Sequence, residues 1–94
     1  MDPERARRFA IERMGSTDVR VRQAAIRALA RRRDPSTLDT LLQLLPTESD
    51  SYVRATLTRC LGVAGGDGAT ATLRDLLGDA SPRVRLAAIE GLAE

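Results

Sequence analysis

The sequence predicts an all-α fold, a short α-solenoid in which three helix pairs stack in a row. Two observations support this prediction. A segment that begins Val-Arg recurs at spacings of 32 and 31 residues, and a second apolar segment with helical spacing precedes each copy. A fixed period of this length is typical of proteins built from repeated helix pairs. The 94 residues are therefore expected to form one domain, residues 1–94, with six helices.

The recurring segments are the predicted second helices of the three pairs. They read VRQAAIRAL from residue 21, VRATLTRCL from residue 53 and VRLAAIEGL from residue 84. Apolar or small residues recur in them at i, i+4, i+7 and i+8, which lie on one face of an α-helix. The positions expected to face the core are Val21, Ala25, Ala28 and Leu29; Val53, Leu57, Cys60 and Leu61; and Val84, Ala88, Gly91 and Leu92.

The apolar segments before them are the predicted first helices. Their core-facing residues are Ala6, Phe9, Ala10 and Met14; Leu38, Leu41, Leu42 and Leu45; and Leu73, Leu76 and Leu77. Asp-Pro or Asp-Gly opens each first helix, at Asp2, Asp34 and Asp67, and Asp18, Asp50 and Ser81 open the second helices. The helices expected from this pattern cover residues 3–14, 18–32, 36–45, 50–63, 68–77 and 81–93.

These motifs resemble the HEAT repeat, in the short variety of phycobilisome-lyase-type proteins. The resemblance rests on an Asp or Ser three positions before Val-Arg, followed by small residues and Ala-Leu, Cys-Leu or Gly-Leu. It covers three repeats, residues 2–33, 34–66 and 67–94. It implies a right-handed superhelix whose second helices line a concave face that binds partners. The family mostly supplies scaffolds and adaptors, although architecture alone does not define activity.

The resemblance also implies a structural role for one arginine in each repeat. These are Arg22, Arg54 and Arg85, each of which follows the first valine of a second helix. In the family this arginine pairs with the turn acid of a neighbouring repeat, here Asp18 or Asp50. We therefore expect these five residues to hold the repeats together.

Other arginines are predicted to face a partner. On a helical projection, Arg20, Arg27 and Arg31 lie on one stripe, on the edge of the helix opposite its core residues. The same positions in the next repeats extend this stripe into a surface over the second helices. The predicted partner-binding residues are Arg20, Gln23, Arg27, Arg31, Tyr52, Arg59, Arg83 and Leu86. The alternative interpretation is that the exposed arginines are only solvated, and that Tyr52 only packs at the start of its helix.

Charge distribution leaves the chemistry of the partner open. Residues 1–33 hold ten arginines and four acids, whereas residues 34–94 hold five arginines and nine acids. We expect an acidic protein partner. Nucleic-acid binding through Arg20, Arg27, Arg31, Arg59 and Arg83 is the alternative, but the chain has only one Tyr and one Phe to stack on bases. An accessory domain of a lyase or another enzyme is a third interpretation.

Composition excludes several kinds of site. The chain has no histidine and one cysteine, Cys60, so it cannot form an internal disulfide, a histidine-based zinc site or a Ser-His or Cys-His nucleophile. We expect no enzymatic activity, no metal and no cofactor, with Cys60 buried in the core rather than reactive. The sequence has no signal peptide and no apolar run near the roughly 20 residues of a membrane span. The prediction is a cytoplasmic protein without membrane contact.

The two ends of the predicted solenoid differ in character. Arg5, Arg7 and Arg8 give the first helix a polar face that could seal the end. Arg32 and Arg33 stand where a helix dipole favours cations. The last helix still carries apolar residues and has no glycine cap, so the chain either continues a longer array, self-associates through this helix, or leaves a small apolar area exposed.

Overall fold

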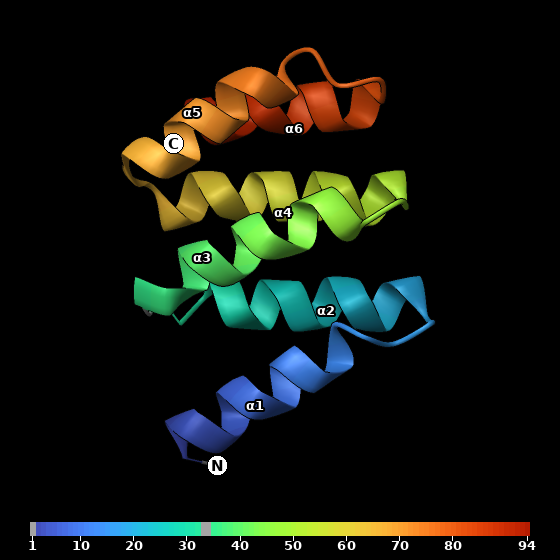
Figure 1. The fold of residues 1–94 in the computed structure, drawn as a ribbon, viewed down its shortest axis with the longest axis vertical. Helices are drawn as coiled ribbons and strands as arrows, with labels where there is room; N and C mark the ends of the chain where they lie inside the picture. The colour runs from blue at the N-terminus through green and yellow to red at the C-terminus, as the bar shows by residue number, and fades with distance from the viewer. Residues whose placement is uncertain (1, 33–34) are drawn as a thin grey trace.

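The structure is a computed structural model that describes residues 2–32 and 35–94. In these residues the chain forms helices joined by short loops, and the helices stack along the longest axis of the molecule (Figure 1). The helices are α1 (Pro3–Arg13), α2 (Val19–Ala30), α3 (Pro35–Leu44), α4 (Ser51–Ala64), α5 (Gly66–Leu76) and α6 (Pro82–Leu92), with a 3-10 helix η1 (Leu45–Thr47) after α3. Each observed α-helix lies within two residues of its predicted bounds.

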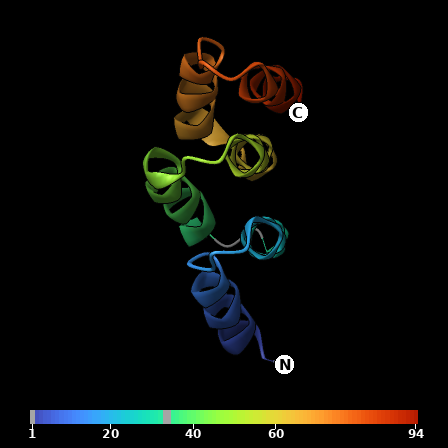
Figure 2. The same ribbon diagram turned by 90° about the vertical axis from the view of Figure 1, so that its right-hand side faces the viewer.

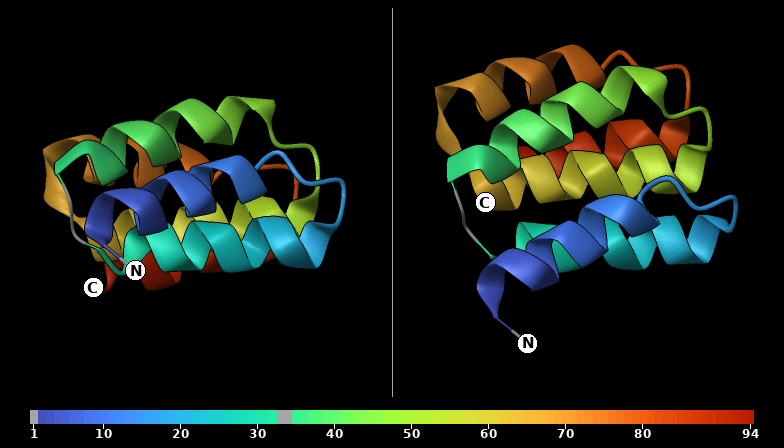
Figure 3. Two further views of the ribbon diagram at one scale, coloured as in Figure 1. Left: turned by 90° about the horizontal axis from the view of Figure 1, so that it is seen from below. Right: turned by 60° about the horizontal axis from the view of Figure 1, so that its bottom comes forward.

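The helices form two layers. Figure 2 shows α1, α3 and α5 in one layer and α2, α4 and α6 in the other, and the two views of Figure 3 agree. The molecule measures 38 × 28 × 17 Å along its principal axes. This arrangement confirms the predicted all-α solenoid of three helix pairs. Among the residues described, no helix is both long enough and apolar enough to cross a membrane.

All three second helices begin with the predicted caps. The Asp18 carboxylate accepts from the amide of Arg20 at 2.9 Å, and the Asp50 carboxylate accepts from the amide of Tyr52 at 2.9 Å. The Ser81 hydroxyl accepts from the amide of Val84 at 3.5 Å. These bonds satisfy amides that a helix start leaves without a partner.

The predicted cap of the third pair, Asp67, is wrong. The residue before α5 is Gly65, and it provides no side-chain bond. Gly65 and Gly66 have φ angles of +74° and +88°, which glycine adopts without steric cost. This turn lets α5 begin at Gly66, so Asp67 lies in its first turn, where the helix dipole favours an acid. Asp34, the cap predicted for the second pair, lies outside the described residues.

The core is centred on α4, which packs between α2 and α6. Its buried side chains are Val53, Ala55, Thr56, Leu57, Thr58, Cys60 and Leu61. They include the predicted stripe of this helix and also the flanking positions, because neighbouring helices cover α4 on both sides. The two buried hydroxyls are satisfied within the helix: Thr56 donates to the carbonyl of Tyr52 and Thr58 to that of Arg54.

The predicted core positions of the outer repeats are partly wrong. Ala28 and Leu92 are exposed, and Val21 is only half-buried. The core of α2 is instead completed by Ile26 and Ala30. In the first helices, Phe9 and Leu77 are exposed as well. The reason is position: these exposed residues lie at the ends of the stack, where no further helix pair of the described chain covers them.

Helices α4 and α6 cross at two glycines, Gly62 and Gly91. A Cβ atom placed on Gly62 would lie 2.5 Å from the Cα atom and 2.7 Å from the carbonyl oxygen of Gly91. Real Cβ atoms do not approach backbone atoms this closely. The absence of a side chain at Gly62 therefore sets the distance between the second and third repeats.

Candidate functional site

Arg22 joins the first repeat to the second. Its Nε and Nη2 atoms donate to the two carboxylate oxygens of Glu48, at 3.1 Å each, and its Nη1 atom donates to the carbonyl of Ser16 at 2.8 Å. The side chains of Arg22 and Glu48 are only 19% and 12% exposed. A bidentate bond of this kind fixes geometry as well as charge, so it holds the loop before α2 against the loop before α4.

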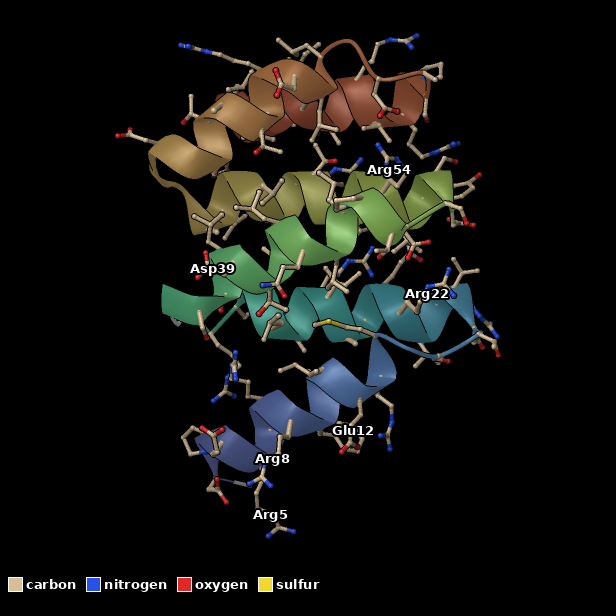
Figure 4. The ribbon with its side chains drawn as sticks, viewed as in Figure 1. Arg5, Arg8, Glu12, Arg22, Asp39 and Arg54 are labelled. Atoms are coloured by element: carbon tan, nitrogen blue, oxygen red, sulfur yellow. The ribbon has the colours of Figure 1, made fainter. Side chains whose placement is uncertain are left out.

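Arg54 makes the same kind of contact between the second and third repeats. Its Nη2 atom donates to the Asp79 carboxylate at 2.6 Å, and its Nη1 atom donates to the carbonyls of Leu45 and Glu48 at 3.1 and 3.3 Å. Figure 4 shows Arg22 and Arg54 on the same side of the stack, one repeat apart. We call the contacts Arg22–Glu48 and Arg54–Asp79 the arginine ladder.

The prediction that these arginines pair with Asp18 or Asp50 is wrong. Both carboxylates face the first amides of their own helices and serve as caps. The acids of the ladder lie two residues before the cap position, in the loop of the following repeat. A sequence signal for them exists, because Glu48 and Asp79 are 31 residues apart, like the Val-Arg segments they precede.

Arg85, the third arginine of the series, contacts its own loop among the described residues. Its Nη1 atom donates to the carbonyls of Asp79 and Ala80 at 2.7 and 3.2 Å. It forms no ion pair with any residue that the structure describes. Its expected inter-repeat role therefore stays a prediction, and within the described residues Arg85 closes its own loop.

The ladder lowers the pKa of Asp79. Burial alone would raise this pKa, but the Ser81 amide, the Arg54 hydrogen bond and the charges of Arg54 and Arg85 together outweigh burial. The pKa of Asp18 is also lowered, chiefly by the backbone amide of Arg20. A carboxyl group whose pKa is lower in the folded chain stabilises the fold above its unfolded pKa.

We expect acid to weaken the fold through Asp79. Its contribution is present above the reference pKa of 3.8 and is lost as the pH falls through the lower folded value. The free energy of unfolding, measured by urea titration at about pH 7 and about pH 3, should fall less in Asp79→Asn than in the wild type. The control is Asp39→Asn, which removes an exposed carboxylate of α3 (Figure 4). Its free energy of unfolding should fall between the two pH values by as much as that of the wild type. Equal acid sensitivity of Asp79→Asn and the wild type would contradict this role.

Three predicted partner-binding arginines lie around Cys60. Arg27 lies on α2, Arg31 caps the end of α2 and Arg59 lies on α4, and all three are exposed. Cys60 is buried beneath them, as expected, and is a free thiol. Burial raises the pKa of the Cys60 thiol, and the charges of Arg27, Arg59 and Arg31 only partly oppose this. The thiol therefore stays protonated and unreactive.

Arg59, a predicted partner-binding residue, already forms an ion pair within the chain. Its Nε atom donates to the Glu90 carboxylate of α6 at 3.4 Å, and the two side chains are about half exposed. Exposed pairs of this kind contribute little to stability. Within residues 2–32 and 35–94, Arg27 and Arg31 form no ion pair, so α2 carries two free cations one helical turn apart.

Tyr52 lies at the start of α4, and the Arg83 side chain covers its ring. The Arg83 guanidinium carbon is 3.8 Å from the centre of the Tyr52 ring, a cation–π contact between α4 and α6. Tyr52 is 56% exposed. Leu86, on α6, is exposed as predicted. These side chains add an aromatic and an apolar group beside the cations.

Gln23 is placed differently from the prediction, whereas Arg20 is exposed as predicted. Gln23 is half-buried, because its amide nitrogen donates to the Thr56 hydroxyl at 3.1 Å and to the Tyr52 carbonyl at 3.4 Å. It contacts the next repeat instead of a partner. Arg20 is exposed, and its Nη2 atom lies 3.4 Å from the Asp18 carboxylate. We use the name second-helix face for the exposed residues of the predicted set: Arg20, Arg27, Arg31, Tyr52, Arg59, Arg83 and Leu86.

The arginines at the end of α2 and on α1 join α1 to neighbouring parts of the chain. The Arg32 Nη2 atom donates to the carbonyl of Pro3 at 2.6 Å, and the Arg7 Nη2 atom donates to the Ser36 hydroxyl at 2.8 Å. Both contacts tie α1 to its neighbours. Arg33, for which a dipole role was predicted, lies outside the described residues.

A groove of about 650 Å³ that the sequence did not predict lies between α1 and α2. Its wall is mostly apolar, although Arg13, Asp18 and Arg20 also line it, and the Arg13 guanidinium carbon lies 3.8 Å from the centre of the Phe9 ring. We call it the N-terminal groove, and its apolar lining includes Ala6, Phe9, Val21, Ala24, Ala25 and Ala28. Exposed Ala28 was the available signal, but helical periodicity placed it in the core.

Comparison with known families agrees with the repeat architecture. A family model described as HEAT repeats matches residues 1–62 and again residues 39–94. The two matches together span the chain. The chain has no significant match among curated proteins. Within the described residues, no group of three or more Cys, Asp or Glu side chains is placed to hold a metal ion.

Proposed function

The chain belongs to the HEAT-repeat family, and from this we propose that it is a non-enzymatic scaffold or adaptor that binds an acidic segment of a protein partner. HEAT repeats commonly serve as scaffolds for protein interactions. The short repeats, of 31 and 32 residues, favour the phycobilisome-lyase-type variety. The binding surface we propose is the second-helix face.

The observation that supports this surface is the pair Arg27 and Arg31. They are exposed on one side of α2 and form no ion pair within the described residues, and Arg59 of α4 lies near the same buried thiol. Arg27 and Arg31 repel one another, and a carboxylate-bearing partner would relieve that repulsion. Arginine suits this role because its planar fork binds carboxylates with two parallel hydrogen bonds.

Tyr52, Arg83 and Leu86 give the same surface an apolar anchor. Tyrosine and arginine are the residues that most often dominate the energy of protein interfaces. Here the guanidinium of Arg83 already rests on the Tyr52 ring, so the pair is held in place before a partner arrives. A partner segment with acids at one end and an apolar side chain at the other fits this distribution.

The contacts favour a protein over a nucleic acid. Single-stranded nucleic acids bind through free aromatic rings on which bases stack. The ring of Tyr52 is covered by Arg83, and Arg59 and Arg20 are already paired with Glu90 and Asp18. The unpaired charge that remains is small compared with the many phosphate contacts of a duplex-binding protein.

The test is a charge reversal at the proposed surface. The double variant Arg27→Glu, Arg31→Glu should bind a fluorescent Glu- and Leu-rich helical peptide at least about tenfold more weakly than the wild type, since it replaces attraction with repulsion. Fluorescence anisotropy measures this at about 50 and 200 mM salt, with labelled duplex DNA and RNA titrated in parallel.

The matched control is Arg5→Glu, Arg8→Glu, which makes the same change in charge on α1. Figure 4 shows these two side chains at the opposite end of the molecule from α6. We expect the control to bind the peptide as the wild type does. If both double variants lost affinity for the peptide equally, the effect would come from net charge and the proposed binding surface would be wrong. Tighter binding of duplex DNA or RNA than of the peptide would replace this proposal with nucleic-acid binding.

A further inference from the structure

Both ends of the solenoid expose surface that the repeats bury where they meet one another. At one end the N-terminal groove is open between α1 and α2. At the other end α6 exposes Ile89 at 57% and Leu86 at 55%, and Leu77 follows α5 at 40%. Apolar area of this kind on a small protein indicates an interaction site. We call the exposed residues Leu77, Ile89, Leu92 and Ala93 the C-terminal face.

The groove side of α2 corresponds to a buried side of α4 and α6. Ala28 is equivalent to Cys60 and Gly91, at offsets of 32 and 31 residues. Cys60 packs beneath the arginines of α2, and Gly91 packs against Gly62 of α4. Both are buried against the preceding second helix, while Ala28 is exposed because no described helix pair covers it.

The C-terminal face corresponds to the opposite side of the same helices. Ile89 is equivalent to Thr58 and Ile26, which are 0% and 2% exposed. The carbonyl of Thr58 lies toward Gly91 of the following helix, so this side faces the next repeat. Ala93 is likewise equivalent to Gly62, which touches α6. The C-terminal face is therefore the surface that each earlier repeat presents to its successor.

The two ends are the two halves of an interface that the chain already forms twice within itself. We propose that a second copy of the chain docks head to tail, with the C-terminal face of one copy in the N-terminal groove of the next. Ile89 would fill the groove beside Ala24, and Ala93 would cross near Ala28. Small residues at the crossing let the two helices approach, as Gly62 and Gly91 do inside the molecule.

Charge favours this orientation over the alternatives. The groove end is basic, because residues 1–33 carry ten arginines against four acids, while residues 34–94 carry nine acids against five arginines. Glu94 follows the last helix, and the groove is lined by two arginines, Arg13 and Arg20, and one acid, Asp18. Two like ends would repel one another, whereas opposite ends attract.

A head-to-tail contact leaves a free groove and a free face on every assembly, so it produces open chains and not a closed dimer. One helix pair against another is a small interface, and we expect a dissociation constant on the order of 100 µM. The mass measured by sedimentation velocity should therefore rise with concentration between about 10 µM and about 1 mM.

Two variants test the two halves separately. Ala28→Glu places a carboxylate in the groove, and Ile89→Glu places one on the C-terminal face; burying either charge in an apolar contact is unfavourable. Each variant alone should remain monomeric at about 1 mM. An equimolar mixture should form a 1:1 dimer and nothing larger, because it contains one intact groove and one intact face.

Ala71→Glu on α5 is the matched control. Position 71 is equivalent to Asp39 and Arg8, and all three are exposed, so it lies outside every contact between repeats. The control should associate as the wild type does, and circular dichroism should show equal helix content in all variants. A wild type that stays monomeric at about 1 mM overturns the proposal. Self-association of either Glu variant alone also overturns it, because this would show a contact between like ends.

Discussion

Gly62→Ala is expected to destabilise the fold by about 3 kcal/mol, because overpacking against backbone cannot be relieved by a change of rotamer. The added methyl group would lie 2.5 Å from the Cα atom of Gly91, so α6 must move away from α4. That movement opens the contact between the second and third repeats and stretches the Arg54–Asp79 bond. Urea titration followed by circular dichroism measures the free energy of unfolding.

Two further glycines serve as controls for this change. Gly91→Ala would bring its methyl group to 3.0 Å from a methyl group of Leu73, a flexible contact, so a loss of about 1 kcal/mol is expected. Gly68→Ala meets only Leu38, at 3.8 Å, and should gain a few tenths to about 1 kcal/mol from helix propensity. If all three substitutions changed stability equally, the crossing of α4 and α6 would not set the packing distance.

Arg54→Met is expected to lower the free energy of unfolding by roughly 2 to 3 kcal/mol, because it leaves partly buried polar groups without partners. The groups it abandons are the Asp79 carboxylate and the carbonyls of Leu45 and Glu48. Methionine keeps most of the side-chain volume, so the loss reports hydrogen bonds and charge. Thermal and urea unfolding both measure it.

Arg85→Met is the matched control for the ladder. Arg85 bonds only to carbonyls of its own loop, so its replacement should cost less than about 1 kcal/mol. Adding Asp79→Asn to Arg54→Met should recover part of the loss, since it removes the unpaired carboxylate. A cycle of single and double variants isolates the coupling between the two residues. Additive losses in this cycle would argue against a direct Arg54–Asp79 interaction.

The sequence predicted the helix pairs well because the repeat supplied three independent copies of each signal. Asp18, Asp50 and Ser81 mark the starts of second helices by their place relative to Val-Arg, and all three act as caps. The predicted burial was correct for the core-facing residues of α4, because neighbouring helices enclose this helix on both sides. Periodicity within one helix indicates which residues share a face, and this was sufficient where every face is covered.

Position along the stack could not be read from one helix at a time. Ala28 and Cys60 have the same periodic position, yet only Cys60 is covered by a preceding helix. The acids of the ladder were missed because Glu48 and Asp79 lie in loops, outside the segment that defines the repeat. Gln23 was assigned to a partner because the pattern of its own helix shows only that it faces outward. Its bond to Thr56 of the next repeat cannot be seen in that pattern. These errors all concern contacts between repeats.

The placement of α4 has a consequence for how the molecule can be divided. Because α2 and α6 each cover one side of it, removing either outer helix pair would leave much of α4 in water. In a long solenoid the repeats contribute to stability nearly independently, through contacts with their neighbours. Here the second repeat has a described neighbour on each side and supplies the largest share of the buried residues, so we expect the three repeats to unfold as a single cooperative unit.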